Sequence, residues 1–308
     1  MPNQPIVVVG SLNADLVVYT NHFPSPGETV RGSDLTVVPG GKSANQAVAA
    51  ARLGGTVTMV GAVGDDAHGL LLIDSLKAAG VDTSHVGRRD DAATGTAVIT
   101  VDDRGENTII ISAGANGTLD SASINHAGTA IDQAAVLCLC LEVPVDVVLA
   151  AARAAQASNT LVLLNLSPFG DVPEELLDLT DILLLNEHEA RDLAGAHQSD
   201  SSWETVASAL RQRKIHRAVI TAGAAGSIVI DAGTIASISA LKVDAVDTTG
   251  CGDAFMGSLA LRLASEDDLL SAVRYASTVG SCVATGRGAQ ASYPDQGQLA
   301  AFIAAAGL

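Results

Sequence analysis

Short apolar runs alternate with stretches rich in Ala and Leu along most of this chain of 308 residues. The runs are apolar throughout, which indicates strands with both faces buried. Such strands, separated by helices, are typical of a parallel sheet that helices cover on both sides. The sequence therefore predicts an α/β fold with a doubly wound, mostly parallel sheet flanked by helices. The predicted strands include Ile6–Gly10, Val57–Ala62, Ala135–Leu141, Thr160–Asn165, Asp181–Leu185 and Ala218–Thr221, and the predicted helices include Ser43–Leu53, Gly69–Ala79, Val145–Gln156, Glu187–Ala194, Trp203–Arg213 and Asp253–Ala264.

Two stretches break this rhythm. Residues 14–38 are extended and rich in turns, with Pro24, Pro26 and Gly27, and residues 94–112 read as strand, turn and strand. The turn at Asp102–Glu106 indicates a hairpin. We therefore predict a small β sheet that stands off the main domain, whose exposed face needs a partner or a ligand to cover it.

The chain is acidic, with 34 acidic and 17 basic residues and a net charge of −17. The basic residues are spread thinly, so we expect no nucleic-acid binding. No apolar run reaches the roughly 18 residues of a membrane span, and the first residues lack the basic and apolar regions of a signal peptide. We therefore expect a cytoplasmic protein that does not bind membranes. The four cysteines lack the spacing of a zinc site.

The segment DTTGCGDAF, Asp247–Phe255, combines a glycine turn with the start of a predicted helix. Gly250 and Gly252 permit a tight turn, and the first N–H groups of a helix have no partner within it. Such a helix start binds anions. Asp253 lies inside it and has two interpretations: a carboxylate that caps the helix, or a base that takes a proton from an attacking hydroxyl.

A second glycine-rich segment, PGGKSANQAVAAARLG, imitates the end of a P-loop at Gly41-Lys42-Ser43. A P-loop needs Gly at position 36, where this chain has Thr36, so a P-loop ATPase is disfavoured. The alternative is a Gly-Gly turn whose N–H groups approach a ligand, with Asn45 in the first helical turn.

Polar residues also follow two of the predicted strands. Asn13 and Asp15 come after the first strand, where α/β proteins bind ligands, although they also suit an ordinary turn. Asn186 and Glu189 stand three apart at another strand end and can share one face of a starting helix. That spacing suits a metal or phosphate contact.

Taken together, these segments resemble the ribokinase / phosphofructokinase-B family of carbohydrate kinases over essentially the whole chain. The matching motifs are NADLV, FPSPGETVRG, GGKSANQAVAAARLG, VGDDAHG, the TG at the start of the hairpin, SAGAN, LEVP, NEHEA, TAGAAG, DTTGCGDAF and GRGAQASYP. DTTGCGDAF is specific to the family, and NAD, GETV and the Gly-Gly-Lys loop point to its ribokinase branch. The resemblance implies one domain over residues 1–308, with a β lid formed by residues 14–38 and 94–112.

The resemblance also implies an activity: ATP-dependent phosphorylation of the 5-hydroxyl of D-ribose. Asp253 would be the base, and the N–H groups of Gly250, Cys251 and Gly252 would hold the transferring phosphoryl group. The sugar would be held by Asn13, Asp15, Gly41, Lys42, Asn45, Glu142 and Asp253. The nucleotide would be bound by Asn186, Glu189, Thr221, Gly223 and Gly252, with Asn186 and Glu189 ordering Mg²⁺ through its waters.

Two further features follow from the resemblance. A site for an activating K⁺ would lie beside the catalytic turn, with most of its ligands main-chain oxygens, from Asp247, Thr249, Val283, Gly286, Gly288 and Ser292. The lid would cover the sugar and form the interface of a homodimer.

The chain departs from the family pattern at Ser43 and Cys251, where the family has Gly and Ala. Ser43 lies next to predicted sugar contacts and bears on which sugar is bound. A thiol at a helix start is expected to be reactive, because the helix dipole favours the thiolate. The alternative functions are a kinase of the same family that acts on deoxyribose, fructose or a nucleoside, and a non-catalytic sugar-binding regulator.

Overall fold

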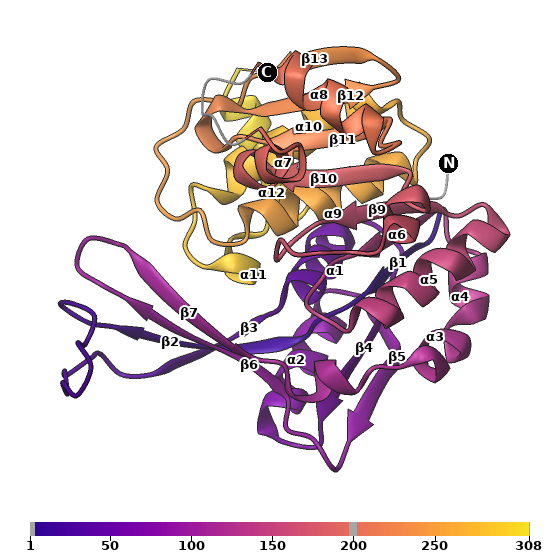
Figure 1. Ribbon diagram of the computed structural model, residues 1–308. Helices are drawn as coiled ribbons and strands as arrows, with labels where there is room; N and C mark the ends of the chain where they lie inside the picture. The colour runs from indigo at the N-terminus through magenta and orange to yellow at the C-terminus, as the bar shows by residue number, and fades with distance from the viewer. Residues whose placement is uncertain (1–3, 197–201, 308) are drawn as a thin grey trace.

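The computed structural model describes residues 4–196 and 202–307, which form an α/β body and a smaller sheet (Figure 1). Within those residues the main sheet has nine strands in the order β13-β12-β11-β10-β9-β8-β1-β4-β5. The strands from β11 to β5 are parallel, and β12 and β13 are an antiparallel extension at one edge. The predicted fold class, a mostly parallel sheet, is confirmed. The strands are β1 (Ile6–Val9), β4 (Val57–Gly64), β5 (Asp82–Arg89), β8 (Val136–Leu139), β9 (Leu161–Asn165), β10 (Ile182–Asn186), β11 (Arg217–Thr221), β12 (Ser227–Asp231) and β13 (Thr234–Ile238).

Two hydrophobic cores lie on opposite faces of this sheet. Alternate residues of β1 point to opposite sides, so Ile6 and Val8 enter one core while Val7 and Val9 enter the other. This explains why the strands are apolar throughout. The first core is covered by α1 (Lys42–Arg52), α2 (Ala67–Ala78), α9 (Cys251–Leu263), α10 (Leu269–Val283) and α12 (Gln296–Ala305). The second is covered by α3 (Ser121–His126), α4 (Gly128–Asp132), α5 (Val145–Ser158), α6 (Glu174–Asp178), α7 (Glu187–Leu193) and α8 (Trp203–Gln212).

The strand order reverses between β1 and β8. From β1 the chain proceeds to β4 and β5 on one side, and it later returns to β8 on the other side and continues to β9, β10 and β11. In sheets of this kind, the connections after the two central strands diverge and leave a crevice at their carboxyl ends. The segments after β1 and β8 therefore mark the expected place for a ligand.

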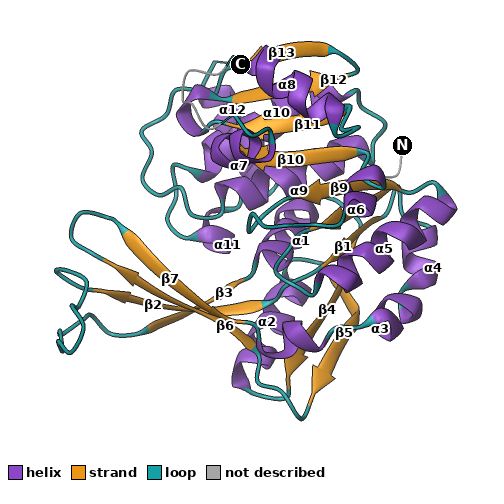
Figure 2. Cartoon of the chain, in the orientation of Figure 1, coloured by secondary structure: helices purple, strands orange, loops and turns teal. Residues whose placement is uncertain are grey.

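The smaller sheet projects from the α/β body, to the left in the view of Figure 2. We call it the lid sheet; its strand order is β3-β2-β6-β7, with β2 (Asn13–Tyr19), β3 (Thr36–Gly40), β6 (Gly95–Val101) and β7 (Asn107–Ser112). The hairpin predicted around residues 102–106 joins β6 to β7. Because β2 begins at Asn13, the predicted sugar contacts Asn13 and Asp15 belong to the lid sheet.

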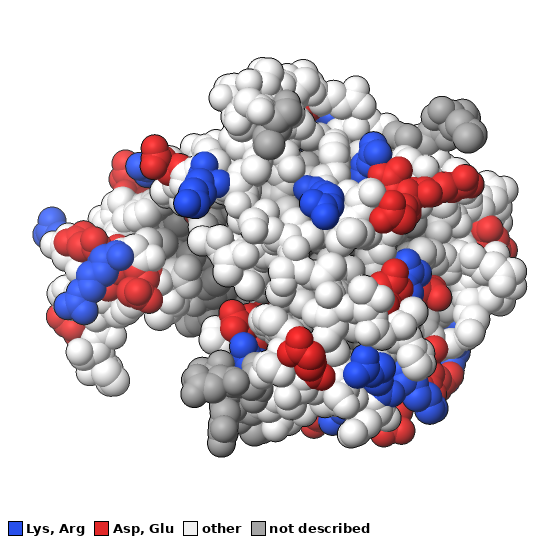
Figure 3. Space-filling model, turned by 90° about the horizontal axis from the view of Figure 1, so that it is seen from above, with Lys and Arg blue, Asp and Glu red and all other residues white. Residues whose placement is uncertain are grey.

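The placement of charged side chains and the hydropathy of the helices bear on nucleic-acid and membrane binding. Lys and Arg side chains lie singly or beside acidic ones on the face shown in Figure 3. Over residues 4–196 and 202–307, no helix has the length and apolar character needed to cross a membrane.

Candidate active site

Residues predicted for the site come together at the carboxyl ends of the parallel strands, where the lid sheet joins the α/β body (Figure 1). Asn13 follows β1 and Glu142 follows β8, so the two lie on either side of the reversal in strand order. Asn186 ends β10 and Thr221 ends β11 at the same edge of the sheet. The fold thus unites segments that lie far apart in the sequence.

Asp253 lies in the first turn of α9 with 9% of its surface exposed. Gly250 precedes this helix with φ 75°, a left-handed conformation that glycine adopts without strain. The Cys251 N–H donates to Thr248 O (3.2 Å), and within the described chain we find no acceptor for the N–H groups of Gly250 and Gly252. The helix start therefore leaves two donors free for an anion beside a buried carboxylate.

Three carboxylates share this part of the molecule, and burial raises the pKa of two of them. Burial, together with the charges of Glu142 and Asp253, raises the pKa of Asp15 to about 7. Burial raises the pKa of Asp253 to about 6, although the positive charge of Lys42 and a hydrogen bond from Asn45 oppose the rise. A carboxylate with a pKa near neutrality is suited to accept a proton reversibly.

Lys42, at the start of α1, supplies the compensating positive charge. Burial alone would lower its pKa, but the surrounding carboxylates outweigh burial, and the pKa is raised; Asp253 and Glu142 contribute most. The side chain therefore stays protonated and offsets the negative cluster.

Two hydrogen-bond donors hold the side chain of Glu142 in place. Its Oε2 accepts hydrogen bonds from the wholly buried Ser11 hydroxyl (2.5 Å) and from the Lys42 N–H (3.1 Å). No described residue donates to Oε1, which is therefore available to a ligand. Ser11 had no role in the sequence analysis, because nothing in its local context distinguishes it from a turn residue.

Asn13 is oriented by a second residue that sequence reasoning missed, Asn116. The Asn116 Oδ1 accepts from the Leu12 N–H (2.9 Å), while its Nδ2 donates to Leu12 O (3.1 Å) and to the Asn13 Oδ1 (2.8 Å). The backbone groups of Leu12 fix which end of Asn116 is the donor, so the Asn13 Oδ1 must be the acceptor. The Asn13 NH₂ group is then left for a ligand. The motif SAGAN was the only available signal.

Asn186 and Glu189 form a capping box at the start of α7. The Asn186 Oδ1 accepts from the Glu189 N–H (2.9 Å), and the Glu189 Oε2 accepts from the Asn186 N–H (2.7 Å). Glu189 is 8% exposed, and its charge contributes to the raised pKa of Lys42. Its second oxygen accepts from no described residue. One such buried carboxylate fits a Mg²⁺ ion that keeps its waters and is held mainly by phosphates.

The other predicted nucleotide residues lie at the end of β11. The Thr221 hydroxyl donates to Leu185 O (3.4 Å), and Gly223 begins the turn 223–225 with φ 53°. Among the described residues, no group of three or more His, Cys, Asp or Glu side chains could hold a metal by itself. Any Mg²⁺ at this edge would therefore depend on the nucleotide for most of its ligands.

The segments predicted to bind K⁺ do meet. Asp247 accepts from the Thr249 N–H at Oδ1 (2.9 Å) and from the Gly288 N–H at Oδ2 (2.8 Å). These hydrogen bonds outweigh burial and lower the pKa of Asp247, so it is ionised at neutral pH. The Ser292 hydroxyl donates to Gly288 O (2.7 Å), and the turn after α10 is closed by a hydrogen bond from the Gly286 N–H to Val283 O (3.0 Å). The donor set, one carboxylate with main-chain carbonyls, suits a hard cation.

Both departures from the family pattern, Ser43 and Cys251, lie at least partly buried. Burial and the charges of Asp247 and Asp253 raise the pKa of Cys251 to about 11, which opposes the effect expected from the helix dipole. Ser43 is wholly buried, and its hydroxyl lies 3.0 Å from the Cys140 sulfur. It packs over Gly10, where any Cβ would collide with it. Ser43 thus faces the core beneath the Gly41 turn.

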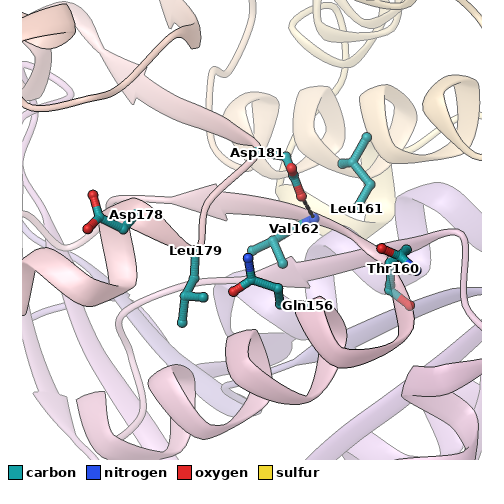
Figure 4. A pocket seen from close by; sticks show the side chains of 8 residues that line it. Gln156, Thr160, Leu161, Val162, Asp178, Leu179 and Asp181 are labelled. Carbon is teal, nitrogen blue, oxygen red and sulfur yellow. Dashed lines mark hydrogen bonds between the residues drawn. The ribbon is translucent and has the colours of Figure 1, made fainter.

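A separate hollow of about 270 Å³ lies at the opposite end of β9 and β10 and contains none of the predicted residues (Figure 4). Its carboxylates are already engaged: Asp181 accepts from the Val162 N–H (2.7 Å), and Asp178 pairs with Lys214 (3.0 Å). The Thr160 hydroxyl donates to Ile131 O and Ala134 O. These polar groups hold the fold together, and we do not regard this hollow as the functional site.

Comparison with known proteins shows which family the chain resembles over nearly its whole length. The model of the pfkB family carbohydrate kinase matches residues 3–296. The chain is 36% identical to a ribokinase of Haemophilus influenzae over 97% of this chain and 98% of the relative, and 38% identical to mouse ribokinase over 94% and 91%. It superimposes on the structure of Arabidopsis thaliana ribokinase complexed with ribose and ATP with a TM-score of 0.90 and 30% identity, covering 97% of this chain and 98% of that one.

Proposed function

The chain belongs to the pfkB family of carbohydrate kinases, and on that premise we propose that it transfers the γ-phosphoryl group of ATP to the 5-hydroxyl of D-ribose. The family and the use of ATP follow from the matches over nearly the whole chain. The choice of ribose rests on the ribokinases among its relatives and on the bound ribose of the Arabidopsis structure.

One observation carries the proposal: a buried carboxylate, Asp253, stands at a helix start that has free N–H groups. Asn45 donates to it at 2.9 Å, and Lys42 supplies a positive charge beside it. A base that accepts a proton from a hydroxyl needs this combination of burial, a raised pKa and access to the phosphate position. A non-catalytic sugar-binding protein would have no use for it.

In the proposed reaction, Asp253 accepts the proton of the sugar's 5-hydroxyl as that oxygen forms a bond to the γ-phosphorus. The bond from the γ-phosphorus to the oxygen bridging the β- and γ-phosphates breaks, and ADP leaves. The N–H groups of Gly250 and Gly252 donate to the oxygens of the transferring group, and that of Cys251 joins them by leaving Thr248 O. Mg²⁺, ordered through Glu189 and Asn186, would neutralise part of the phosphate charge when it is bound with ATP.

Sugar recognition is assigned to the groups around this base. Asp15 and the free oxygen of Glu142 accept hydrogen bonds from sugar hydroxyls, and the free NH₂ group of Asn13 donates to one. Gly41 and Lys42 border the same space at the start of α1, and Asn45 lies one helical turn inside it. Holding the acceptor in this way converts the reaction into one between fixed partners, which accounts for much of the catalysis.

The test is a panel of D-ribose, deoxyribose, fructose and a nucleoside in a coupled assay of ADP release, with Asp253→Asn as the negative control. We expect D-ribose to give the highest kcat/KM. A higher value for another acceptor would replace ribose by that acceptor within the same family. Binding of sugars without ATP turnover would support the non-catalytic regulator instead.

We further propose that K⁺ activates the enzyme through the loop around Asp247. A cation there would offset a carboxylate that otherwise repels incoming phosphate, and it would stiffen the turn that carries Gly250. In buffer with tetramethylammonium as the only monovalent cation, addition of K⁺ should raise kcat or lower the sugar KM, and Na⁺ should do less. Rates that ignore K⁺ at every concentration would remove the cation from the mechanism.

A further inference from the structure

Three hydrogen bonds link helix α2 to Asp253 through buried amide side chains. The Ser75 hydroxyl donates to the Gln290 Oε1 (2.7 Å), the Gln290 Nε2 donates to the Asn45 Oδ1 (3.0 Å), and the Asn45 Nδ2 donates to the Asp253 Oδ2 (2.9 Å). Gln290 and Asn45 are each 6% exposed. We call this series, Ser75 to Gln290 to Asn45 to Asp253, the Gln290 relay.

The carboxylate of Asp253 decides which group of each amide in the relay donates and which accepts. An ionised carboxylate only accepts hydrogen bonds, so Asn45 must direct its NH₂ group at Asp253. The Asn45 Oδ1 then points the other way, into a buried space where it needs a donor. Gln290 is that donor, and its own Oε1 is satisfied by the Ser75 hydroxyl. Every polar end in the relay is therefore paired in one consistent direction.

Gln290 lies in α11 (Ala289–Ser292), and the backbone of this segment is held by side chains from elsewhere in the chain. The Arg52 Nη1, at the end of α1, donates to Gln290 O (2.7 Å) and to Tyr293 O (2.9 Å). The Tyr293 hydroxyl donates to the carbonyl oxygen of Gly250 (3.1 Å), and Gly250 is the glycine that precedes α9. The segment that carries Gln290 is thus hydrogen-bonded to α1 and to the glycine turn. The backbone from which the Gln290 side chain extends is therefore fixed in position.

We propose that Gln290 is a positioning residue that keeps the Asn45 amide directed at Asp253 and so holds the base ionised and aimed at the acceptor hydroxyl. This inference rests on the proposed role of Asp253 as the base. Other charged or titratable groups also act on Asp253: Lys42 from α1 favours its ionised form, Glu142 and Asp15 disfavour it, and Cys251 and Tyr293 lie close by in protonated form. Through the Gln290 relay, the uncharged Asn45 amide also donates to Asp253 and favours its ionised form.

The direct test is Gln290→Met, which keeps the length and volume of the side chain but has no amide. Without its donor, the Asn45 Oδ1 would be buried unpaired, so Asn45 turns away and Asp253 loses a hydrogen bond. We expect kcat to fall roughly 3–10-fold and the acid limb of the kcat profile to move up by about half a pH unit. ADP affinity, measured by calorimetry, should stay unchanged, because among the described residues the Gln290 side chain hydrogen-bonds only Ser75 and Asn45, neither of which is a predicted nucleotide residue.

Gln296→Met is the matched control. The Gln296 Nε2 also ties the C-terminal region to α1, by donating to Leu53 O (2.8 Å), but it does not touch Asn45. Gln296 is exposed, so its loss should lower stability less than the loss of Gln290, and it should leave the pH profile in place. If Gln290→Met and Gln296→Met behave alike, the relay is only structural and the inference is wrong.

Two further variants keep the test decisive if Gln290→Met folds poorly. Ser75→Ala removes the first donor of the relay from a helix position that does not touch the substrate, and it should shift the acid limb in the same direction by less. In an Asp253→Asn background, Gln290→Met should add little to the loss of kcat, whereas additive losses would overturn the inference. Absence of turnover with every sugar in the unmodified enzyme would instead refute the proposed function.

Discussion

The raised pKa of Asp253 suits its proposed role as a base, but it lowers the free energy of unfolding. Its pKa in the folded protein is about 6, against 3.8 for the unperturbed group, chiefly because of burial. Between these two values the folded state binds the proton more tightly than the unfolded state does. The free energy of unfolding therefore falls as the pH rises through this window, and the penalty is complete at about pH 7 and above.

Replacement of Asp253 by Asn should separate these two effects. We expect kcat to fall roughly 10²–10⁴-fold, the usual span for a positioned base. In the same variant the free energy of unfolding of the ligand-free protein should rise by about 1–3 kcal/mol at pH 8, with no gain at pH 4. Urea denaturation at both pH values measures the second effect, with the exposed Asp74→Asn as the control. Normal turnover in Asp253→Asn would exclude this residue as the base.

Asp15 should act mainly on binding of the sugar. As a carboxylate it can accept hydrogen bonds from two adjacent hydroxyls, and such bonds contribute about 1.5–3 kcal/mol each. Asp15→Ala should therefore raise the KM for ribose by roughly 10–100-fold, with a smaller change in kcat. Ribose analogues that lack one of these hydroxyls should show a similar loss with the unmodified enzyme. A KM that stays the same would place Asp15 outside the sugar site.

At the scale of elements, the start of β2 depends on the turn that carries Asn116. Asn13 pairs with Gly95 of β6, and a Cβ on Gly95 would collide with both asparagine amides. Two lid strands and the Gly114–Thr118 turn therefore meet at one packed point. This junction fixes where the lid sheet leaves the body and how Asn13 faces the site.

Asn116→Asp tests this junction while preserving the shape of the side chain. The new carboxylate still accepts from the Leu12 N–H, but it can no longer donate to the Asn13 Oδ1. Asn13 must then turn its NH₂ group toward residue 116 and present its oxygen to the ligand. We expect the KM for ribose to rise about 10-fold, the usual effect of losing one hydrogen bond. Asn125→Asp, on the exposed surface of α3, is the control, and an equal KM in both variants would contradict this role for Asn116.

At the scale of the whole molecule, the lid sheet exposes apolar side chains on both faces; Ile109 and Ile111, on the face of Asp15, are 53% and 50% exposed. Asp15 pairs with Ala97 and Val38, so these residues share the face proposed to cover the sugar. Leu16, Val98, Ile110 and Val37 pair across the four strands and share the opposite face. Ile110 is 71% exposed and Val98 43%. An apolar stripe of this kind is stabilised when a partner covers it.

Ile110→Lys should therefore disrupt the homodimer that the lid was expected to form. A buried lysine without a partner is unfavourable at an interface, whereas a lysine on a free surface costs little. Light scattering at micromolar concentration should report a dimer for the unmodified chain and a monomer for the variant. Leu70→Lys, which replaces an exposed leucine on α2, should leave the dimer intact. A monomeric unmodified chain would count against assembly through the lid.

Local patterns in the sequence were enough to predict the parallel sheet, the order of its main elements and the presence of a hairpin apart from the body. Apolar periodicity and turn residues act over a few positions, so they are visible in any sequence. The helices α10 and α12 were not predicted, nor were the strands β5, β12 and β13. Their pairing depends on neighbours that a local window does not contain.

The tertiary structure alone decided which polar residues act together. Ser11 reaches Glu142 across 131 positions, Asn116 reaches Leu12 across 104, and Gln290 reaches Asn45 across 245. The same packing sets the pKa of Asp15 and Asp253, because burial is a property of the assembled core. It also buries Ser43 against Cys140 and raises the pKa of the Cys251 thiol. A residue type states which hydrogen bonds a side chain can form, and only the folded chain determines which of them it does form.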